Sequence, residues 1–352
     1  MLVQKIGTKE SSKCFISVII IVYDRSDFII DALKSLQKQT LDKDLFEVIL
    51  GTNVQLRLPN FSGLNVYVIN SDITRGSAKY IQGIEFCHGE VVCLFDDDDV
   101  FTPDKLQLVY TIFKGHSSLI FYRNEYLRSK NVDNISPPSI FSSSKGSRLR
   151  FYNVSNSSQK IFWKLKGYGS MSQFSTMSVR KIYFDNQEIK SLFLNPDIRV
   201  GDSLLFMSLF SFEKPVEIAI DSKILTIYRV HNSFSHLNWI DSHNARNISN
   251  EVTSLTLMKN SFTNMAIIFQ NVDFLKRCSA LEEAIYSLKI SLLVNEEVGL
   301  NTLRKIVILS FLERKITPLV YIFIYFLRMT IPDKIRSKVE HAMSAIKDHF
   351  LL

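Results

Sequence analysis

The sequence predicts an α/β fold, in which a mostly parallel central sheet is followed by a C-terminal helical region. Short and almost continuous apolar runs alternate with amphipathic helical patterns through the first hundred of the 352 residues. Parallel strands that helices cover on both faces require such runs. Strand-like runs disappear after about residue 240, where helical patterns take over. A chain of this length suits one large domain with an appendage, or two domains.

Four apolar runs predict the first strands of the sheet, at residues 15–23, 45–50, 65–70 and 91–95. Between the first two runs, apolar residues recur at helical spacing over residues 27–38, with Ser26 as the expected N-cap. A second helix is expected after Ser77, ending near Gly89. Because helices connect the strands in this order, we expect the strands to be parallel.

A third helix is predicted directly after the last of these strands. Thr102 is its expected N-cap, Pro103 its first residue and Gly115 its end. Residues 129–160 are polar, and we expect a long loop there, either a substrate-facing segment or an insertion without a direct role. The apolar run at residues 224–230 predicts a further strand.

The C-terminal helical patterns cover residues 243–269, 272–293, 297–312 and 316–349. We therefore expect an α/β domain over residues 1–237 and a helical region over residues 238–352. No uncharged apolar stretch reaches 18 residues, so a membrane-spanning helix is not expected. The N-terminus lacks the apolar core of a signal peptide, and the four cysteines form no C-x-x-C pair. Both observations favour a cytoplasmic protein with buried, reduced thiols.

The net charge of +7 is unevenly distributed: it is −4 over residues 1–100 and +8 over residues 101–240. A nucleic-acid-binding protein typically shows a continuous basic face with interleaved aromatic residues, so we expect no nucleic-acid partner. The basic segment includes Trp163 and Tyr168 among Arg148, Arg150, Lys160, Lys164 and Lys166. These residues indicate either contacts to a sugar or phosphate of an acceptor, or solvated surface charge.

Four consecutive aspartates, Asp96 to Asp99, directly follow the predicted strand at residues 91–95. In open α/β sheets, ligands bind at the carboxyl ends of strands, which is where this cluster falls. Two carboxylates about 4 Å apart repel by roughly 4 kcal/mol at an effective dielectric constant near 20. A divalent cation removes this repulsion, and carboxylate oxygens suit Mg²⁺ or Mn²⁺. The alternative is a solvated acidic turn or a helix cap.

Four segments, in order, resemble motifs of the inverting family 2 glycosyltransferases. They are SVIIIVYDR at residues 17–25, RGSAKYIQGIEFCHGEVVCLFDDDD at 75–99, GDSLLF at 201–206 and YRVHNSFS at 228–235. They resemble the nucleotide-contacting first strand, the helix and strand leading to the Asp-x-Asp motif, the segment with the catalytic base, and the Arg-x-His turn. The resemblance implies a GT-A fold and transfer from a nucleotide-sugar donor to a hydroxyl acceptor, a glycan or a lipid-linked sugar.

The resemblance also implies a donor site. Tyr23 and Asp24 would flank the nucleotide, Asp96 would contact its ribose or the metal, and Asp97 would also contact the nucleotide sugar. Where the family commonly has Asp-Asp-Gly-Ser after the second strand, this chain has Gly-Thr-Asn, ending at Asn53. The carboxylate that reads the donor base is therefore missing, although the Asn53 amide could still hydrogen-bond a pyrimidine edge.

For the metal and the base, the resemblance implies Asp98 as the principal ligand of Mg²⁺ or Mn²⁺, with His231 beside the metal or the diphosphate. Asp202 would be the general base, which takes the acceptor's proton while the metal stabilises the departing nucleoside diphosphate. The alternative for Asp202 is an ordinary N-cap. The chain departs from the family pattern at Tyr80, which replaces part of an Arg-Asn pair, and at Gly201, which replaces an acidic residue.

Two rival functions remain open at the level of sequence. A nucleotidyltransferase on a similar sheet would use the aspartates but would not need Asp202. A catalytically silent module would bind a nucleotide or glycan without turnover.

The uncharged segment at residues 316–327 is twelve residues long, about 18 Å as a helix and short of a ~30 Å hydrocarbon core. Basic residues flank it on both sides. It suits either peripheral attachment to the cytoplasmic face of a membrane or the core of a small helical bundle.

Overall fold

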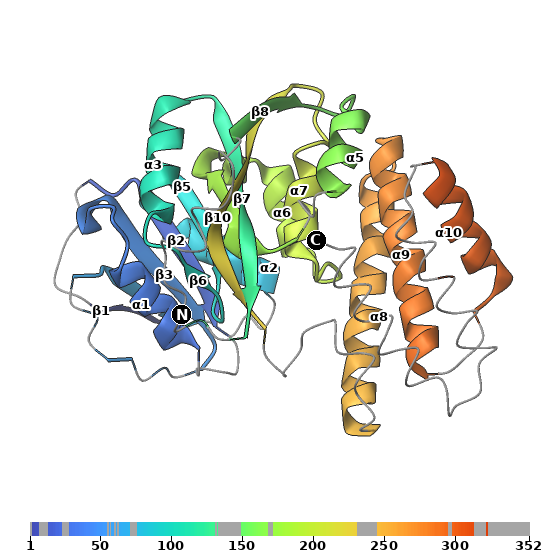
Figure 1. The fold of residues 1–352 in the computed structure, drawn as a ribbon, viewed down its shortest axis with the longest axis horizontal. Coiled ribbons are helices and arrows are strands. Elements are labelled where there is room, and N and C mark those ends of the chain that lie inside the picture. Colours follow the sequence, from blue (N-terminus) through green and yellow to red (C-terminus); the bar gives the residue numbers. More distant parts are fainter. Residues whose placement is uncertain are drawn as a thin grey trace. The chain divides into compact units, whose positions relative to one another are not determined.

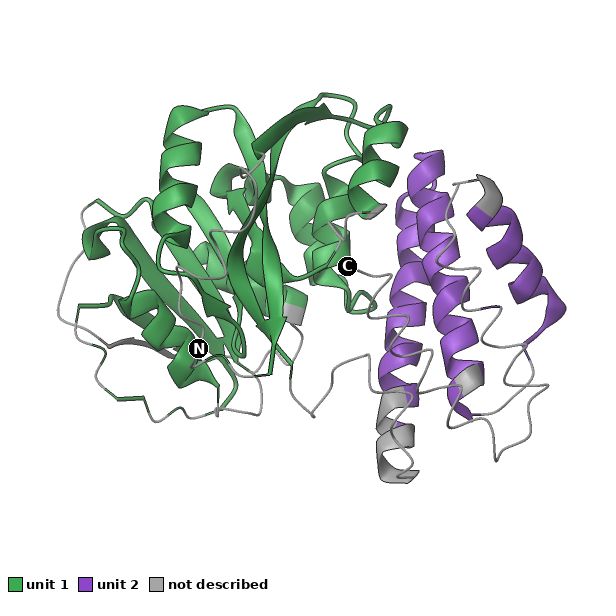
Figure 2. Ribbon diagram, viewed as in Figure 1, with its two compact units in different colours: residues 1–230 green, residues 231–352 purple. Residues whose placement is uncertain are grey.

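The computed structural model describes residues 2–6, 13–22, 28–54, 56, 58–59, 61, 63–70, 76–130, 132, 149–167, 172–230, 245–294, 298–312 and 322. The chain divides into two compact units, residues 1–230 and residues 231–352 (Figure 2). The predicted boundary between residues 237 and 238 lies outside the described residues and stays a prediction.

The first unit contains a ten-stranded sheet with the order β1-β4-β3-β2-β5-β9-β7-β10-β6, in which β8 also pairs with β10 (Figure 1). Its strands are β1 Leu2–Ile6, β2 Ile16–Val22, β3 Phe46–Thr52, β4 Val66–Asn70, β5 Val91–Asp96, β6 Val100–Phe101, β7 Leu119–Ser129, β8 Leu149–Val154, β9 Met177–Arg180 and β10 Val216–Arg229. Strands β4, β3, β2 and β5 pair in parallel, as do β7 and β10. Since β9 is antiparallel to both β5 and β7, these two groups run in the same direction. The prediction of a mostly parallel central sheet is confirmed.

The helices of this unit are α1 Ile29–Gln37, α2 Gly76–Glu85, α3 Lys105–Gly115, α5 Gln159–Gly167, α6 Gln187–Leu194 and α7 Gly201–Ser208. Three short 3₁₀ helices accompany them, η1 Lys43–Leu45, η2 Phe174–Thr176 and η3 Lys181–Asp185. The predicted strands and helices of the first hundred residues are confirmed, with shifts of a few residues at their ends. Ser26, the expected cap of α1, lies outside the described residues.

Two local predictions are wrong. Helix α3 begins at Lys105 with Asp104 as its N-cap, and the Thr102 hydroxyl donates to Asp104 Oδ1 at 2.9 Å rather than capping the helix. The expected loop over residues 129–160 contains β8 and the start of α5, because β8 pairs with the edge of β10. Residues 131 and 133–148 lie outside the described part of the chain.

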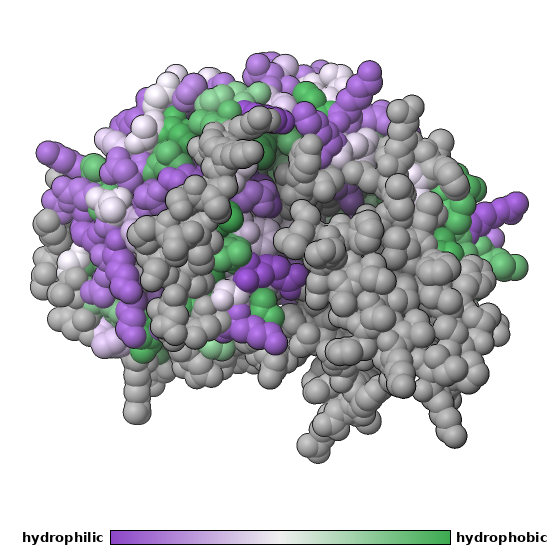
Figure 3. All heavy atoms as spheres, viewed as in Figure 1, coloured by the Kyte–Doolittle hydropathy of each residue, from purple (hydrophilic) through white to green (hydrophobic). Residues whose placement is uncertain are grey.

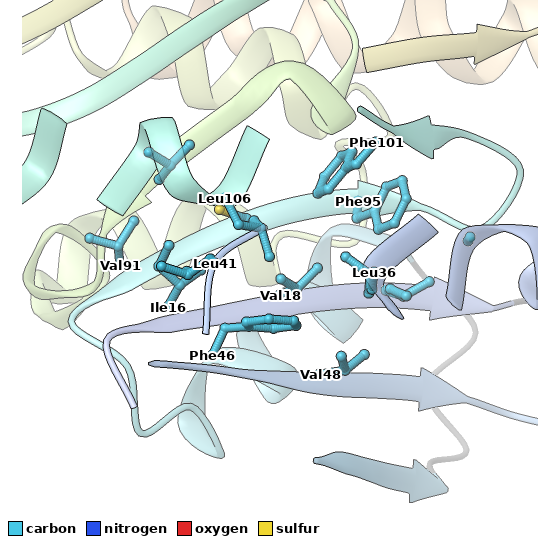
Figure 4. Close-up of a cluster of buried hydrophobic side chains, with 14 of the residues drawn as sticks. Ile16, Val18, Leu36, Leu41, Phe46, Val48, Val91, Phe95, Phe101 and Leu106 are labelled. Atoms are coloured by element: carbon cyan, nitrogen blue, oxygen red, sulfur yellow. The ribbon is translucent and has the colours of Figure 1, made fainter. Parts of the chain in front are cut away.

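The core beneath the sheet explains why the apolar runs form strands. Ile16, Val18, Phe46 and Val91 on three neighbouring strands are at most 1% exposed and pack in one cluster with α1 and α3 (Figure 4). Burying a large apolar side chain fully contributes about 1.5–3 kcal/mol. The surface is mixed, and Figure 3 shows hydrophilic and apolar residues interspersed on one face.

Gly89 makes a close backbone approach at the start of β5. A Cβ atom there would lie 2.7 Å from the Ser17 nitrogen, closer than a side chain tolerates. Of the four free cysteines, Cys87, Cys93 and Cys278 are buried, as predicted, and Cys14 is half-buried.

The second unit contains α8 Ala245–Ile268, α9 Asp273–Val294 and α10 Leu300–Leu312, which confirms the C-terminal helical region. Its apolar core includes Leu281, Leu288 and Ile306, and Ile322 packs against that core. The rest of the predicted helix at residues 316–349 lies outside the described residues. Within the described part of the chain, we find no helix with the length and apolar character that a membrane crossing needs.

Candidate active site

The candidate site lies where three neighbouring parallel strands end. In the register of the sheet, Ile21 of β2 pairs with Gly51 of β3 on one side and with Asp96 of β5 on the other. These strands therefore end level with one another. Two strand spacings place the end of β3 about 10 Å from the end of β5. Ligands of open α/β sheets bind at such an edge.

Asp96, the last residue of β5, is half-buried and held by two hydroxyl groups. The Tyr80 hydroxyl donates to its Oδ1 at 3.3 Å, and the Ser175 hydroxyl donates to its Oδ2 at 3.4 Å. Ser175 Oγ in turn accepts the backbone N–H of Asp96 at 3.0 Å. Burial, with the neighbouring negative charges that include Asp202, raises the pKa of Asp96 well above its usual range. The charge of Asp202 is therefore felt at Asp96, although the two residues are distant in the sequence.

Asp202, the expected base, is the second residue of α7. The helix has Val200 as its N-cap, so the alternative of Asp202 as an ordinary cap does not hold. Its Oδ2 accepts the backbone N–H of Gln173 at 3.0 Å, and its Oδ1 accepts that of Ser203 at 2.7 Å. Burial raises the pKa of Asp202, and these N–H groups offset part of that shift. A raised pKa suits a general base that works near neutral pH.

One short segment joins the two aspartates. Gln173 contacts Asp202 through its N–H, and Ser175, two residues further on, contacts Asp96. Among the described residues, Gln173 is the one non-glycine residue with a positive φ, at 75°. A non-glycine residue in the left-handed region costs of order 1–3 kcal/mol, and such strain clusters at functional sites. We name residues 173–176 the bridging segment.

A buried lysine supports the bridging segment from α3. Lys105 is 0% exposed, and its ammonium group donates to the Ser175 carbonyl oxygen and, at 3.0 Å, to Thr226 Oγ1. Burial lowers the pKa of Lys105 to about 7. The bridging segment is thus tied to the sheet and to both candidate acidic residues.

Two of the departures from the family pattern, Tyr80 and Gly201, lie against the same aromatic ring, that of Phe174. The rings of Tyr80 and Phe174 are 4.6 Å apart between centroids. A Cβ atom on Gly201 would lie 2.8 Å from Phe174 Cζ, so only glycine fits there without a shift of that ring. The residues at positions 80, 174 and 201 are therefore mutually adapted, which the sequence motifs did not reveal.

Asp98 and Asp99 contact Arg229, which lies at the start of the predicted Arg-x-His turn. Arg229 donates through its backbone N–H to Asp99 Oδ1 at 3.1 Å and through Nε to the Asp98 carbonyl oxygen at 2.8 Å. A third donor, Arg229 Nη2, reaches Asp31 Oδ2 at 2.8 Å. Asp97 is buried and Asp98 is half-buried. His231, two residues beyond Arg229, lies outside the described residues.

A divalent cation fits the donor set at this edge. Asp99 is 0% exposed, and its Oδ2 has no hydrogen-bond partner among the described residues. Burial and the charge of Asp98 raise the pKa of Asp99 to about 7. No three His, Cys, Asp or Glu side chains within the described ranges form a metal-binding group. Mg²⁺ needs only one or two protein carboxylates when phosphates and waters complete its shell, and the role of Asp98 as the metal ligand stays a prediction.

At the end of β3, Asn53 is exposed and is held by a buried lysine. Lys79 of α2 is 1% exposed, and its Nζ donates to Asn53 Oδ1 at 2.9 Å and to the Val22 carbonyl oxygen at 3.4 Å. Tyr23 and Asp24, which follow β2, lie outside the described residues. Of the predicted donor residues, Asn53, Asp96 and Asp97 thus lie at one edge of the sheet.

Sequence reasoning missed the residues that hold the site, namely Lys79, Tyr80, Ser175 and Lys105. Charged residues on the apolar faces of predicted helices were the available signal for Lys79 and Lys105. Trp163 is only 8% exposed and packs on Phe162, and its contact with an acceptor stays a prediction. Arg148 and Tyr168 lie outside the described residues.

Comparison with known proteins shows what part of the chain is similar to. Residues 17–183 match the family model described as glycosyl transferase family 2, which confirms the resemblance and includes the aspartate cluster but not Asp202. Among solved structures, the chain is similar to S. aureus TarS 1–349 in complex with UDP-GlcNAc, with 16% identity, 84% of this chain and 79% of that chain covered, and a TM-score of 0.45. The chain is also similar to a structure of S. aureus TarS, with 15% identity, 82% of this chain and 50% of that chain covered, and a TM-score of 0.44. No curated protein sequence matches the chain.

Proposed function

We propose, on the premise of a glycosyl transferase family 2 region at residues 17–183, that the protein is a glycosyltransferase. It moves a sugar from a nucleotide-sugar donor to a hydroxyl group. The transfer inverts the configuration at the anomeric carbon. The acceptor we propose is a glycan or a lipid-linked sugar. The observation that carries the proposal is the bridging segment, which hydrogen-bonds to Asp96 and to Asp202 and so fixes a donor-side and an acceptor-side carboxylate together.

In this proposal, Asp202 accepts the proton of the acceptor hydroxyl as that oxygen attacks the anomeric carbon. The N–H groups of Gln173 and Ser203 hold the carboxylate in one orientation, which keeps an oxygen lone pair available for the proton. The raised pKa makes Asp202 a stronger base than an exposed aspartate. Tyr23, Asp24, Asn53, Asp96 and Asp97 are the proposed nucleotide-sugar contacts.

Asp98 and His231 are the proposed ligands of Mg²⁺ or Mn²⁺. A bound divalent cation would supply charge neutralisation for the departing diphosphate. Two hydrogen bonds of Arg229, to Asp99 Oδ1 and to the Asp98 carbonyl oxygen, hold the start of the Arg-x-His turn against the aspartate cluster.

We propose a cytoplasmic location, with peripheral membrane attachment through residues 316–349. The contact of Ile322 with the core of the second unit supports the bundle alternative at that position. Flotation of the intact protein with phosphatidylserine vesicles tests attachment, and protein that stays at the bottom of the gradient argues for the bundle alone.

The experiment for the proposed function is release of nucleoside diphosphate from a panel of nucleotide sugars, with the intact protein and Mg²⁺ or Mn²⁺. We expect turnover of one donor class, loss of turnover in Asp98→Ala, and retention in Asp185→Ala, an exposed aspartate outside the site. Binding without turnover for every donor would favour the catalytically silent module and overturn the proposal.

A further inference from the structure

The Asn53 side chain can be oriented without ambiguity. An ammonium group only donates hydrogen bonds, so the amide atom 2.9 Å from Lys79 Nζ must be the carbonyl oxygen. The NH₂ group of the same amide therefore points away from Lys79. Because Asn53 is exposed, this NH₂ group is accessible to a ligand at the end of β3.

Lys79 itself is fixed in place. It is 1% exposed, and it also donates to the Val22 carbonyl oxygen at the end of β2. A rotation of the Asn53 amide by half a turn would set its NH₂ group against the ammonium group, donor to donor, and break the 2.9 Å hydrogen bond. The chain thus presents hydrogen-bond donors at the position where the family pattern has a carboxylate, which only accepts.

The two pyrimidines differ at the edge that such a group would read. Uracil presents an N–H donor at N3 between two carbonyl acceptors, whereas cytosine presents acceptors at both O2 and N3 and a donor at N4. An amide NH₂ group opposes the uracil N3–H donor to donor, and it can donate to only one of the two carbonyl oxygens that flank this N–H. The same group can donate to the adjacent O2 and N3 atoms of cytosine.

We propose, resting on the function proposed above, that Asn53 reads the donor base as a hydrogen-bond donor, with the result that the protein takes a cytidine nucleotide in preference to a uridine nucleotide. Lys79 is the positioning residue that sets this preference, because it holds the carbonyl oxygen of Asn53. Asp96, two strands away in the sheet, remains on the ribose and diphosphate side of the same nucleotide.

Isothermal titration calorimetry of the intact protein with CDP, UDP and GDP in Mg²⁺ tests the proposal. We expect CDP to bind roughly tenfold more tightly than UDP, the discrimination that one well-matched pair of hydrogen bonds provides. Asn53→Asp replaces the donor with an acceptor for N3–H, so it should reverse the order of CDP and UDP. Lys79→Met frees the amide to rotate and should bring the CDP to UDP ratio close to one.

The exposed Lys34 supplies a matched control, since Lys34→Met removes an ammonium group from the preceding helix and should keep the ratio. If Lys79→Met does not fold, the exposed Asn53→Asp still decides the matter. Tighter binding of UDP or GDP than of CDP by the unaltered protein would overturn this inference and leave the proposed function standing. Absence of binding by all three nucleotides would overturn both.

Discussion

The two units of the chain bury different kinds of side chain. In the first unit, Lys79, Asp99, Lys105 and Arg123 are all at most 1% exposed. In the second unit, the described core is apolar, and the ion pair of Arg277 with Asp273 lies on the surface of one helix. A buried charge costs several kcal/mol unless partners compensate it, so it accumulates where chemistry requires it. The buried charges at the candidate site therefore lie in the first unit, whereas the described core of the second unit is apolar packing.

The largest expected effect concerns Asp202, the proposed base in the first unit. Asp202→Asn keeps the shape of the side chain but removes the base, so we expect transfer to fall by about 10²- to 10⁴-fold. Circular dichroism and nucleotide affinity should stay as in the unaltered protein. Asp197→Asn, an exposed residue just before α7, serves as the control with full activity. Full transfer by Asp202→Asn would remove the first unit's proposed base.

In the second unit, we expect substitutions that remove core packing to lower the stability of the protein. Ile306 is 0% exposed in α10, whereas Ile308 on the same helix is 51% exposed. We expect Ile306→Ala to destabilise the protein by about 2–5 kcal/mol, and Ile308→Ala to cost far less. Denaturant unfolding measures both values. Equal effects of the two variants would contradict the assignment of Ile306 to the core.

The glycine beside Asp202 offers a sharper test of how the site is packed. Gly201→Ala forces a methyl group against Phe174, which should cost about 1–3 kcal/mol and lower the transfer rate. The double variant Gly201→Ala with Phe174→Leu should recover most of both losses, because the smaller side chain vacates the space. Unfolding and transfer assays of the three variants check this, and an additive double variant would refute the mutual adaptation.

A further expected effect concerns the pH dependence of stability. The pKa of Lys105 is lowered by burial to about 7 in the folded protein, whereas an unfolded lysine titrates near 10.4. The unfolded chain therefore binds more protons between these values, and stability should rise with pH from about 7 to about 10. The slope is at most about 1.4 kcal/mol per pH unit. Thermal unfolding of Lys105→Met over the same pH range should show no such rise in stability. A pH slope equal to that of the unaltered protein would contradict the assignment of the rise to Lys105.

The elements with local signals could be predicted from the sequence. Strands β2, β3, β4 and β5 carry uninterrupted apolar runs, and the aspartates follow directly on β5. Strands β1, β6, β7, β8 and β9 were missed because they depend on pairing with partners distant in the sequence, such as β8 with β10. Propensity alone does not encode such pairing.

The candidate site likewise contains residues with a local sequence signal and residues without one. The candidate carboxylates stood in recognisable motifs, whereas their supports are separated from them by long stretches of chain. Ser175 contacts Asp96 across 79 residues, and Lys79 contacts Asn53 across 26. The left-handed conformation of Gln173 has no sequence signal, since glycine would be the expected residue there.

The most direct test of the central claim, that Asp202 takes the acceptor's proton, is the rate of sugar transfer as a function of pH at saturating donor and acceptor. A base works only when it is deprotonated, so the rate should fall as the pH drops through the raised pKa of Asp202, above the ordinary value near 4. The residual transfer by Asp202→Asn should lack that acid limb. The same acid limb in Asp202→Asn would contradict the account.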